Sequence, residues 1–158
     1  MPLDPDTFRA VLGRFASGVT VVTTRDDAGR DHGMTVSAFC SLSLEPPLVL
    51  VCVDHAASMH PLLVVGAQLA INILAAGQEA LSRRFSGKDA DRFDGIGYSR
   101  GLTGAALLDD VLAALECRIA RTHEGGDHTI VIAEVESASA RAERPLLYYR
   151  GGYAQLER

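Results

Sequence analysis

Several chemically informative residues are scarce in this sequence, and each shortage argues against a class of function. Of the 15 basic residues, one is a lysine, Lys88, and the other 14 are arginines. Schiff-base chemistry would have to use Lys88, which lies in a polar Ser-Gly-Lys-Asp stretch that offers the amine little desolvation. We therefore do not expect a catalytic lysine.

Cysteine is scarce too. The three cysteines, Cys40, Cys52 and Cys117, include no Cys-x-x-Cys pair. Each lies among apolar residues, which is typical of a buried free thiol. Free thiols suit a reducing compartment, so the sequence predicts a cytoplasmic protein.

The chain lacks an apolar run long enough to cross a bilayer. Its longest apolar stretch, residues 62–77, is broken by Gly66, Gln68 and Asn72, whereas a spanning helix needs about 20 apolar residues. The first residues are acidic and do not resemble a secretory signal. The net charge of −5 gives no electrostatic reason to bind nucleic acid or an acidic membrane. A small molecule or a protein is the expected partner.

Familiar catalytic and nucleotide motifs are missing as well. The sequence has neither a Gly-x-Ser-x-Gly nucleophile elbow nor a Gly-x-x-x-x-Gly-Lys phosphate loop. In the segment Gly95–Gly101 the third glycine comes one place late for a dinucleotide fingerprint, so we expect a loop there. Neither His55 with His60 nor His123 with His128 has a third ligand at a recognised spacing, so no metal site is expected.

The remaining composition indicates one mainly β domain over residues 1–158. The hydrophobic fraction of 47% shows no break along the chain. Helices are expected at 6–16, capped by Asp6 or Thr7, and at 78–86. Strands are expected at Val19–Thr24, His32–Phe39, Leu48–Val53, Leu69–Leu74, Leu112–His123, Thr129–Ala138 and Leu146–Tyr149. Without alternating βαβ units, these strands predict a mainly antiparallel barrel.

Two segments between these elements have a distinct character. Residues 124–128, Glu-Gly-Gly-Asp-His, separate two long strand patterns and predict a hairpin whose loop uses the conformational freedom of glycine. Residues 87–104 are rich in Gly and Asp, and we expect them to form an excursion outside the core.

Hydroxyl side chains recur two apart in the segment 33–47, at Thr35, Ser37, Ser41 and Ser43. In an extended strand this spacing places Thr35 and Ser37 on one face, where both could hydrogen-bond the polar edge of a ligand. The same pattern also suits an ordinary solvated strand face, so the residues alone leave both interpretations open.

Six stretches, taken in order, resemble the successive motifs of the short-chain flavin reductases, a family that includes the reductase partners of two-component flavin-dependent monooxygenases. These stretches are 18–24, 33–47, 69–74, 84–86, 125–128 and 145–153. The resemblance implies an FMN-binding split barrel, a Greek-key β-barrel, that forms homodimers. It also implies an enzyme that reduces FMN or FAD with NADH or NADPH and delivers the reduced flavin to a monooxygenase.

The resemblance further implies which residues contact the cofactors. Flavin contacts are expected from Thr35, Val36, Ser37, Ala38, Phe39, Cys40, Ala57, Ser58, Met59, Phe85 and Ser86. The nicotinamide side is expected to involve His128, as the catalytic residue, with Tyr148, Tyr149, Arg150 and Gly151. The turn 54–58 has fewer hydroxyls than in many relatives, which leaves FMN versus FAD open.

Two other functions fit parts of this pattern. A non-catalytic flavin-binding or redox-sensor protein can use the same barrel, since a fold does not fix a function. An oxidase of the pyridoxamine-phosphate type would need a basic pocket for the substrate phosphate, which the sequence alone does not locate.

Overall fold

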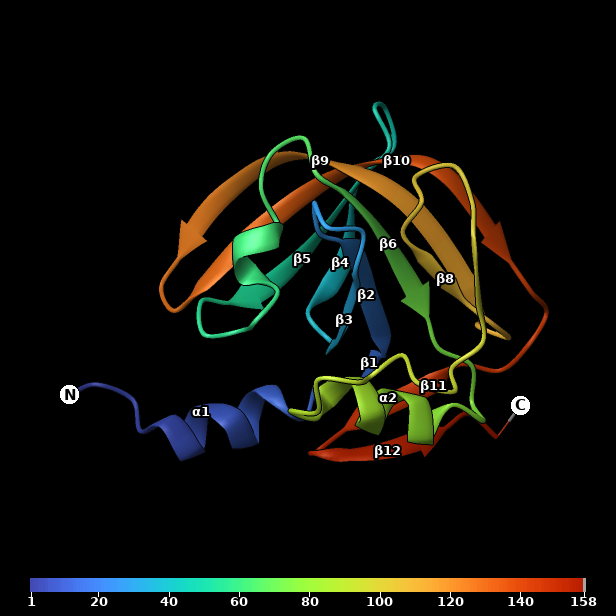
Figure 1. Ribbon diagram of the computed structural model, residues 1–158. Helices are drawn as coiled ribbons and strands as arrows, with labels where there is room; N and C mark the ends of the chain where they lie inside the picture. The colour runs from blue at the N-terminus through green and yellow to red at the C-terminus, as the bar shows by residue number, and fades with distance from the viewer. Residues whose placement is uncertain (158) are drawn as a thin grey trace.

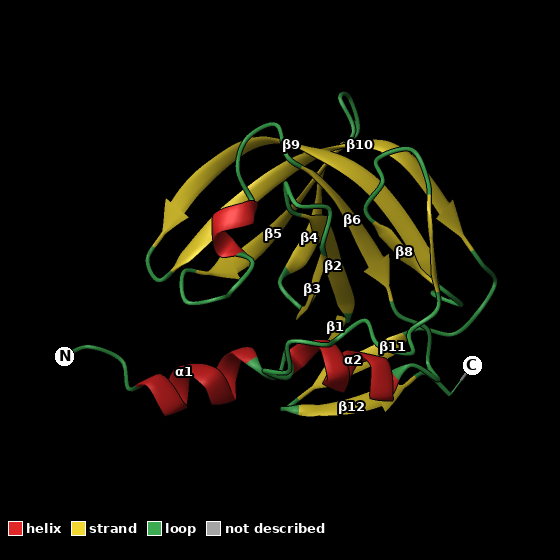
Figure 2. Cartoon of the chain, in the orientation of Figure 1, coloured by secondary structure: helices red, strands yellow, loops and turns green. Residues whose placement is uncertain are grey.

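A computed structural model describes residues 1–157 and is mainly β, as predicted (Figures 1 and 2). Its helical elements are α1 (Pro5–Leu12), the 3₁₀ helix η1 (His60–Leu62) and α2 (Glu79–Ser86). Its strands are β1 (Ser17–Gly18), β2 (Thr20–Arg25), β3 (Asp31–Val36), β4 (Phe39–Ser43), β5 (Leu48–Asp54), β6 (Gln68–Ile73), β7 (Tyr98–Arg100), β8 (Ala106–Leu108), β9 (Ala113–Gly125), β10 (His128–Ala140), β11 (Leu146–Tyr149) and β12 (Gly152–Gln155).

The main sheet has seven strands in the order β3-β2-β6-β9-β10-β5-β4, and every neighbouring pair is antiparallel. It curves strongly, with α2 and the small β1-β11-β12 sheet below it (Figure 1). Strands β3 and β4 are its two edges and do not pair with each other, so the sheet is open.

Alternating burial explains why β5 forms a strand, whereas β2 and β6 are buried along most of their length. In β5, Val49, Val51 and Val53 are buried while the residues between them are more exposed. This is the pattern of a strand with one face on the core. Val22, Ile71 and Ile119 from neighbouring strands join the same apolar cluster.

The long β9–β10 hairpin confirms the expected one. His128 pairs with Gly125, leaving the two-residue turn Gly126-Asp127. Gly126 has a φ of +71°, a value that L side chains rarely adopt, so the loop does use glycine's freedom. The predicted strands for β2, β5, β6 and β11, and the helix at 78–86, also match the structure to within one or two residues.

The first helix differs from its prediction in length and in its cap. It ends at Leu12, and its N-cap is Asp4, whose carboxylate accepts a hydrogen bond from the Thr7 backbone N–H at 3.0 Å. Pro5 occupies the first turn, where its missing N–H costs nothing. The proposed caps Asp6 and Thr7 were therefore wrong, because Pro5 allows the helix to begin before them.

The strand predicted for His32–Phe39 is two strands with a break at Ser37-Ala38. Strand β3 pairs with β2 at one edge of the sheet, and β4 pairs with β5 at the other. The chain must cross between the edges at the break, so alternation does not continue through it. The expectation that Thr35 and Ser37 share one strand face was therefore wrong.

The segment 87–104 contains structure that the sequence did not indicate. It includes β7, which pairs with β8. Strand β8 is fixed to the core by Asn72, whose side chain is fully buried and donates to the Val21 carbonyl at 3.0 Å. The Asn72 carbonyl oxygen accepts from the Leu108 N–H at 2.9 Å. Strands β1, β4 and β12 were also not predicted.

The cysteines do not share one environment. Cys117 is buried, and the pKa of its thiol is raised to about 12. Burial is the main cause, and the negative charges of Glu136 and Glu116 raise this pKa further. Cys52 is half-buried and Cys40 is exposed on the edge strand β4. The expectation of three buried thiols holds for Cys117 alone, because an edge strand leaves Cys40 open to solvent.

Candidate functional site

A cavity of about 490 Å³ lies between β3, the turn after β5 and α2. It brings together five of the predicted flavin residues from three separate parts of the chain. These are Thr35, Ala57, Ser58, Phe85 and Ser86. Met34, Ala56, Gly87, Lys88 and Arg92 complete the wall. A volume within the ~300–1,000 Å³ range of small-molecule sites makes this cavity our candidate flavin site.

Helix α2 is held against β3 by close contacts at two positions. A Cβ atom on Gly33 would lie 2.6 Å from the Phe85 ring, so only glycine lets this buried ring pack so closely. Thr35 donates its hydroxyl hydrogen to the Ser82 carbonyl at 2.7 Å. The Thr35 hydroxyl therefore positions the helix, and its hydrogen is not free for a ligand.

Lys88 and Arg92 are site residues that the sequence reasoning missed. Arg92 donates to the carbonyls of Gly33, at 2.7 Å, and of Phe85 and Gly87 at the end of α2. Lys88 is exposed at the mouth of the cavity. Polar surroundings argue against Lys88 as a nucleophile, but they suit a charged lysine that pairs with a phosphate. This was the signal in the sequence that could have identified Lys88.

The remaining flavin residues do not line this cavity. Ser37, Ala38 and Cys40 are exposed on the segment that joins the two edges of the sheet. Val36 and Met59 are buried. Phe39 is half-buried and packs against the main core cluster. The C=O groups of Ser37 and Ala38 accept from the Phe39 and Cys52 N–H groups, at 2.9 and 3.0 Å. Within residues 1–157, the N–H groups of Ser37 and Ala38 make no hydrogen bond, so these donors are open to a ligand.

His128 lies at the tip of the β9–β10 hairpin, close to the turn that lines the cavity. It pairs in register with Asp54, the last residue of β5, and the His55 N–H donates to the Asp127 carbonyl at 2.9 Å. Its Nδ1 is 2.7 Å from an Asp127 carboxylate oxygen. This contact lowers the pKa of Asp127. The His128 side chain is 41% exposed, so it is free to meet a ligand.

Tyr148–Gly151 forms the end of β11 and the turn into β12. Arg150 and Gly151 have φ values of 52° and 77°, and together they make the tight two-residue hairpin turn. The Arg150 N–H donates to the Gly13 carbonyl at 2.8 Å, which fixes this turn beside the end of α1. Neither this segment nor His128 contributes to the wall of the candidate flavin cavity.

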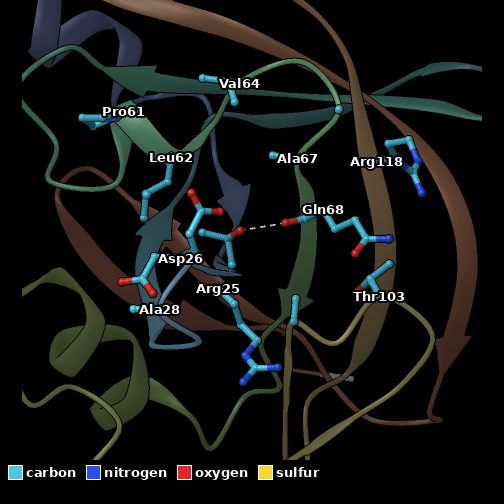
Figure 3. Close-up of a pocket in the computed structure, with 14 residues that line it drawn as sticks. Arg25, Asp26, Ala28, Pro61, Leu62, Val64, Ala67, Gln68, Thr103 and Arg118 are labelled. Atoms are coloured by element: carbon cyan, nitrogen blue, oxygen red, sulfur yellow. Dashed lines mark hydrogen bonds between the residues drawn. The ribbon is translucent and has the colours of Figure 1, made fainter.

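A larger cavity, of about 750 Å³, lies elsewhere in the molecule (Figure 3). It is lined by the β2–β3 turn and the chain around η1, with Arg25 and Arg118 at its rim, and contains none of the predicted residues. Size alone therefore does not select the site. Within residues 1–157, no group of three or more His, Cys, Asp and Glu side chains is placed to hold a metal ion, and no helix is long and apolar enough to cross a membrane.

Comparison with known proteins decides the family. The family model described as "Flavin reductase like domain" matches residues 12–157. The chain belongs to this family. The reductase subunit HsaB of a flavin-dependent monooxygenase from Mycobacterium tuberculosis is 40% identical, over 98% of this chain and 84% of HsaB.

Two further members of the family carry different flavins in their names. The FMN reductase (NADH) SmoA from Agrobacterium fabrum is 40% identical, over 96% of this chain and 86% of SmoA. The NADH:FAD oxidoreductase SgcE6 from Streptomyces globisporus, solved with NAD and FAD fragments, superposes with a TM-score of 0.91. It is also 40% identical, with 99% of this chain and 96% of that chain covered.

Proposed function

We propose that this protein is an NAD(P)H-dependent flavin reductase that reduces FMN or FAD and supplies the reduced flavin to a partner monooxygenase. The observation that carries the proposal is the meeting of the predicted flavin residues around one cavity, in a chain that matches the flavin reductase like family from residue 12 to 157. The names of its relatives, including the monooxygenase reductase subunit HsaB, support the same reaction and partner.

The residues present fit a flavin phosphate. Ser58 and Lys88, at the edge of the cavity, provide a hydroxyl and an ammonium group, and the Arg92 guanidinium adds positive charge nearby. Charge-assisted hydrogen bonds of this kind are about twice as strong as neutral ones. Lys88 thus provides a phosphate partner that the hydroxyl-poor turn 54–58 lacks.

The ring system of the flavin fits beside the exposed segment Ser37–Cys40. The backbone N–H groups of Ser37 and Ala38 make no hydrogen bond within residues 1–157, and donors directed at the ring edge stabilise the negative charge that develops during reduction. Phe85 forms an apolar wall of the cavity. These residues bind and orient the ring.

When bound, the two cofactors supply the redox chemistry, in which a hydride passes from carbon 4 of the nicotinamide to nitrogen 5 of the flavin. The protein's task is to hold both rings in reach, and positioning alone can lower a barrier by roughly 7–11 kcal/mol. We assign His128 to orienting the nicotinamide or its pyrophosphate. Tyr148–Gly151 completes the nicotinamide side in this proposal.

We further propose that residues 1–158 form one split-barrel domain that works as a homodimer. Helix α1 has no buried residue and exposes Phe8, Val11 and Leu12, and Phe15 is exposed just after it. Figure 1 shows this helix extending away from the sheet. An apolar face of this kind marks an interaction surface, and a second copy would cover it. Sedimentation showing a flavin-competent monomer at micromolar concentration would contradict the homodimer.

We also propose a cytoplasmic location, because all three cysteines are free thiols and a reducing compartment keeps thiols reduced.

The reaction is tested by one steady-state assay that crosses FMN and FAD with NADH and NADPH. We expect flavin-dependent oxidation of at least one nicotinamide. If the protein binds flavin but oxidises no nicotinamide in any of the four combinations, the result would instead favour a flavin-binding or sensor protein. The assay also identifies the preferred nicotinamide.

A further inference from the structure

A second cavity, of about 370 Å³, adjoins the candidate flavin cavity. The two share Ser58, Lys88 and Arg92 in their walls, the residues that fit a flavin phosphate. Beyond them, the second cavity is lined by Arg30, Asp31, His32, Gly33, Met59, Asp89, Ala90 and Phe93. A ligand whose phosphate lies at the shared residues would therefore have space to continue past it.

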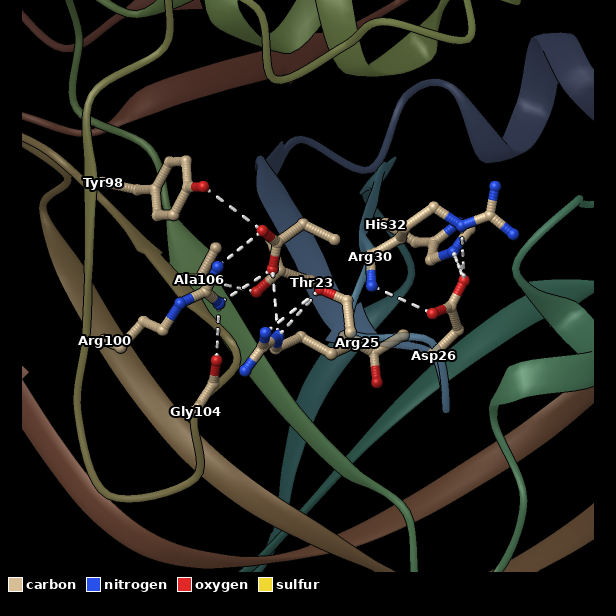
Figure 4. Close-up of polar contacts among 12 residues, drawn as sticks. Thr23, Arg25, Asp26, Arg30, His32, Tyr98, Arg100, Gly104 and Ala106 are labelled. Atoms are coloured by element: carbon tan, nitrogen blue, oxygen red, sulfur yellow. Dashed lines mark hydrogen bonds and ion pairs between the residues drawn. The ribbon is translucent and has the colours of Figure 1, made fainter.

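Arg30, in the β2–β3 turn, and His32, in β3, line this second cavity, and both contact Asp26 (Figure 4). An Asp26 carboxylate oxygen lies 2.9 Å from His32 Nε2 and 3.4 Å from Arg30 Nε. The other oxygen accepts from the Arg30 backbone N–H at 2.9 Å. Asp26 thus fixes the turn that presents Arg30 and His32.

Two acidic residues also face this cavity. Arg100 binds both carboxylate oxygens of Asp31, at 2.6 and 2.8 Å, and the Tyr98 hydroxyl lies 3.3 Å from one of them (Figure 4). Asp31 is therefore neutralised by a partner outside the wall. Asp89 is exposed and has solvent around it. The three cations Arg30, Lys88 and Arg92 outnumber the two remaining acids, Asp89 in the wall and Asp26 beside Arg30, so the cavity keeps an excess of positive charge.

FMN ends at a single phosphate, whereas FAD continues into a second phosphate and an adenosine. We propose that the second cavity binds the adenosine monophosphate half of FAD, with Arg30 and His32 on the second phosphate and the apolar wall of Met59 and Phe93 beside the adenine. This assignment rests on the proposed flavin reductase function. It makes FAD the preferred flavin, which family membership does not decide because similar relatives are named for FMN and for FAD.

NADH and NADPH also carry an adenosine diphosphate group, so either of them could in principle occupy the second cavity in place of FAD. FAD is favoured because the cavity joins the flavin cavity through the phosphate residues. Its wall also lacks His128 and Tyr148–Gly151, the residues assigned to the nicotinamide cofactor.

The test is a fluorescence titration of the whole protein with FAD and with FMN. We expect the wild type to bind FAD at least ~10-fold more tightly than FMN, as one or two added charge-assisted hydrogen bonds would give. Arg30→Gln and His32→Gln should each reduce the ratio of Kd(FMN) to Kd(FAD) by about 5-fold or more, acting on Kd for FAD. Arg141→Gln, a matched control at an exposed arginine paired with Asp110 and Glu143, should leave the ratio unchanged.

Three results would overturn the assignment. The first is equal affinity of the wild type for FMN and FAD. The second is an unchanged ratio of Kd(FMN) to Kd(FAD) in both Arg30→Gln and His32→Gln, with both variants keeping the wild-type melting temperature. The third is a raised KM for NADH in Arg30→Gln, measured with FMN, without any change in the flavin ratio, which would give the cavity to the nicotinamide cofactor. Failure of the wild type to bind either flavin would contradict the proposed function itself, a distinct result from FMN binding without an advantage for FAD.

Discussion

The β9–β10 hairpin and the segment from residue 87 to 108 are both ordered, but they pack into different apolar clusters and differ in their polar contacts. The hairpin inserts Ile119, Val131 and Ala133 into the main apolar cluster. The other segment packs Phe93, Ile96 and Leu108 into a second, smaller apolar cluster. It is also held by polar contacts, such as those of the Arg84 guanidinium with the carbonyls of Asp91, Arg92 and Asp94. The candidate cavity lies where this segment meets the sheet, so changes there should alter binding while changes in the core alter stability.

The largest effect on binding is expected from Ser37→Tyr. Ser37 is exposed at the break between β3 and β4, so a tyrosine can stay in solvent in the free protein while blocking the ring site. We expect flavin affinity to fall by more than about 100-fold, or roughly 2.7 kcal/mol, with the melting temperature unchanged. Ser137→Tyr, at an exposed position on β10, is the control for bulk alone. Unchanged affinity in a flavin titration would place the ring elsewhere.

His128→Ala should damage the use of nicotinamide and leave flavin binding intact. Loss of one or two hydrogen bonds should lower kcat/KM for NAD(P)H by roughly 10- to 100-fold, about 1.4–2.7 kcal/mol. The melting temperature should stay near the wild-type value, because the side chain is partly exposed and at a hairpin tip. His123→Ala, an exposed histidine on the same hairpin, is the matched control. A lower melting temperature with unchanged kcat/KM would show a structural role.

Asn72→Ala tests the expectation that changes in the core alter stability and leave binding unchanged. It leaves the buried Leu108 N–H without its acceptor and frees the Val21 carbonyl, which should cost about 1–3 kcal/mol of unfolding free energy. Flavin affinity of the folded protein should not change. Urea unfolding of this variant beside Gln155→Ala, an exposed amide, gives the difference. Equal stability of the two variants would contradict a structural role for the buried amide.

The smallest expected effect concerns pH and the β2–β3 turn. Hydrogen bonding to His32, and then to the Arg30 N–H, lowers the pKa of Asp26 from 3.8 to about 2. Because the folded state lowers this pKa, the stabilisation is complete above about pH 4 and is lost as the pH falls towards 2. The melting-temperature gap between wild type and Asp26→Asn should therefore shrink over that range. A gap that is constant with pH would exclude the ionised carboxylate as its cause.

The sequence predicted the buried strands β2 and β6, the alternating strand β5 and the helix α2 that lines the cavity. It could not show that β3 and β4 lie at opposite edges, since Thr35, Ser37 and Ser41 all fall on alternate positions of one continuous strand pattern. Edge position depends on which distant strands pair, and local periodicity carries no such information. Strands β7 and β8 were missed for a related reason, because their order depends on long-range polar partners such as Asn72.

The candidate site was predicted in part. The resemblance supplied Ala57, Ser58, Phe85 and Ser86, which the structure gathers around one cavity. Lys88 was set aside because its surroundings are polar. The structure places Lys88 in the wall of the same cavity as Ser58, and no spacing rule connects these two segments of the chain.

The most direct test of the account is a crystal structure of the protein with bound flavin. We expect the isoalloxazine ring beside Ser37–Cys40 and Phe85, with its phosphate at Ser58 and Lys88. A flavin found instead in the larger cavity near Arg25 and Arg118 (Figure 3), with the cavity between β3 and α2 empty, would contradict the central claim.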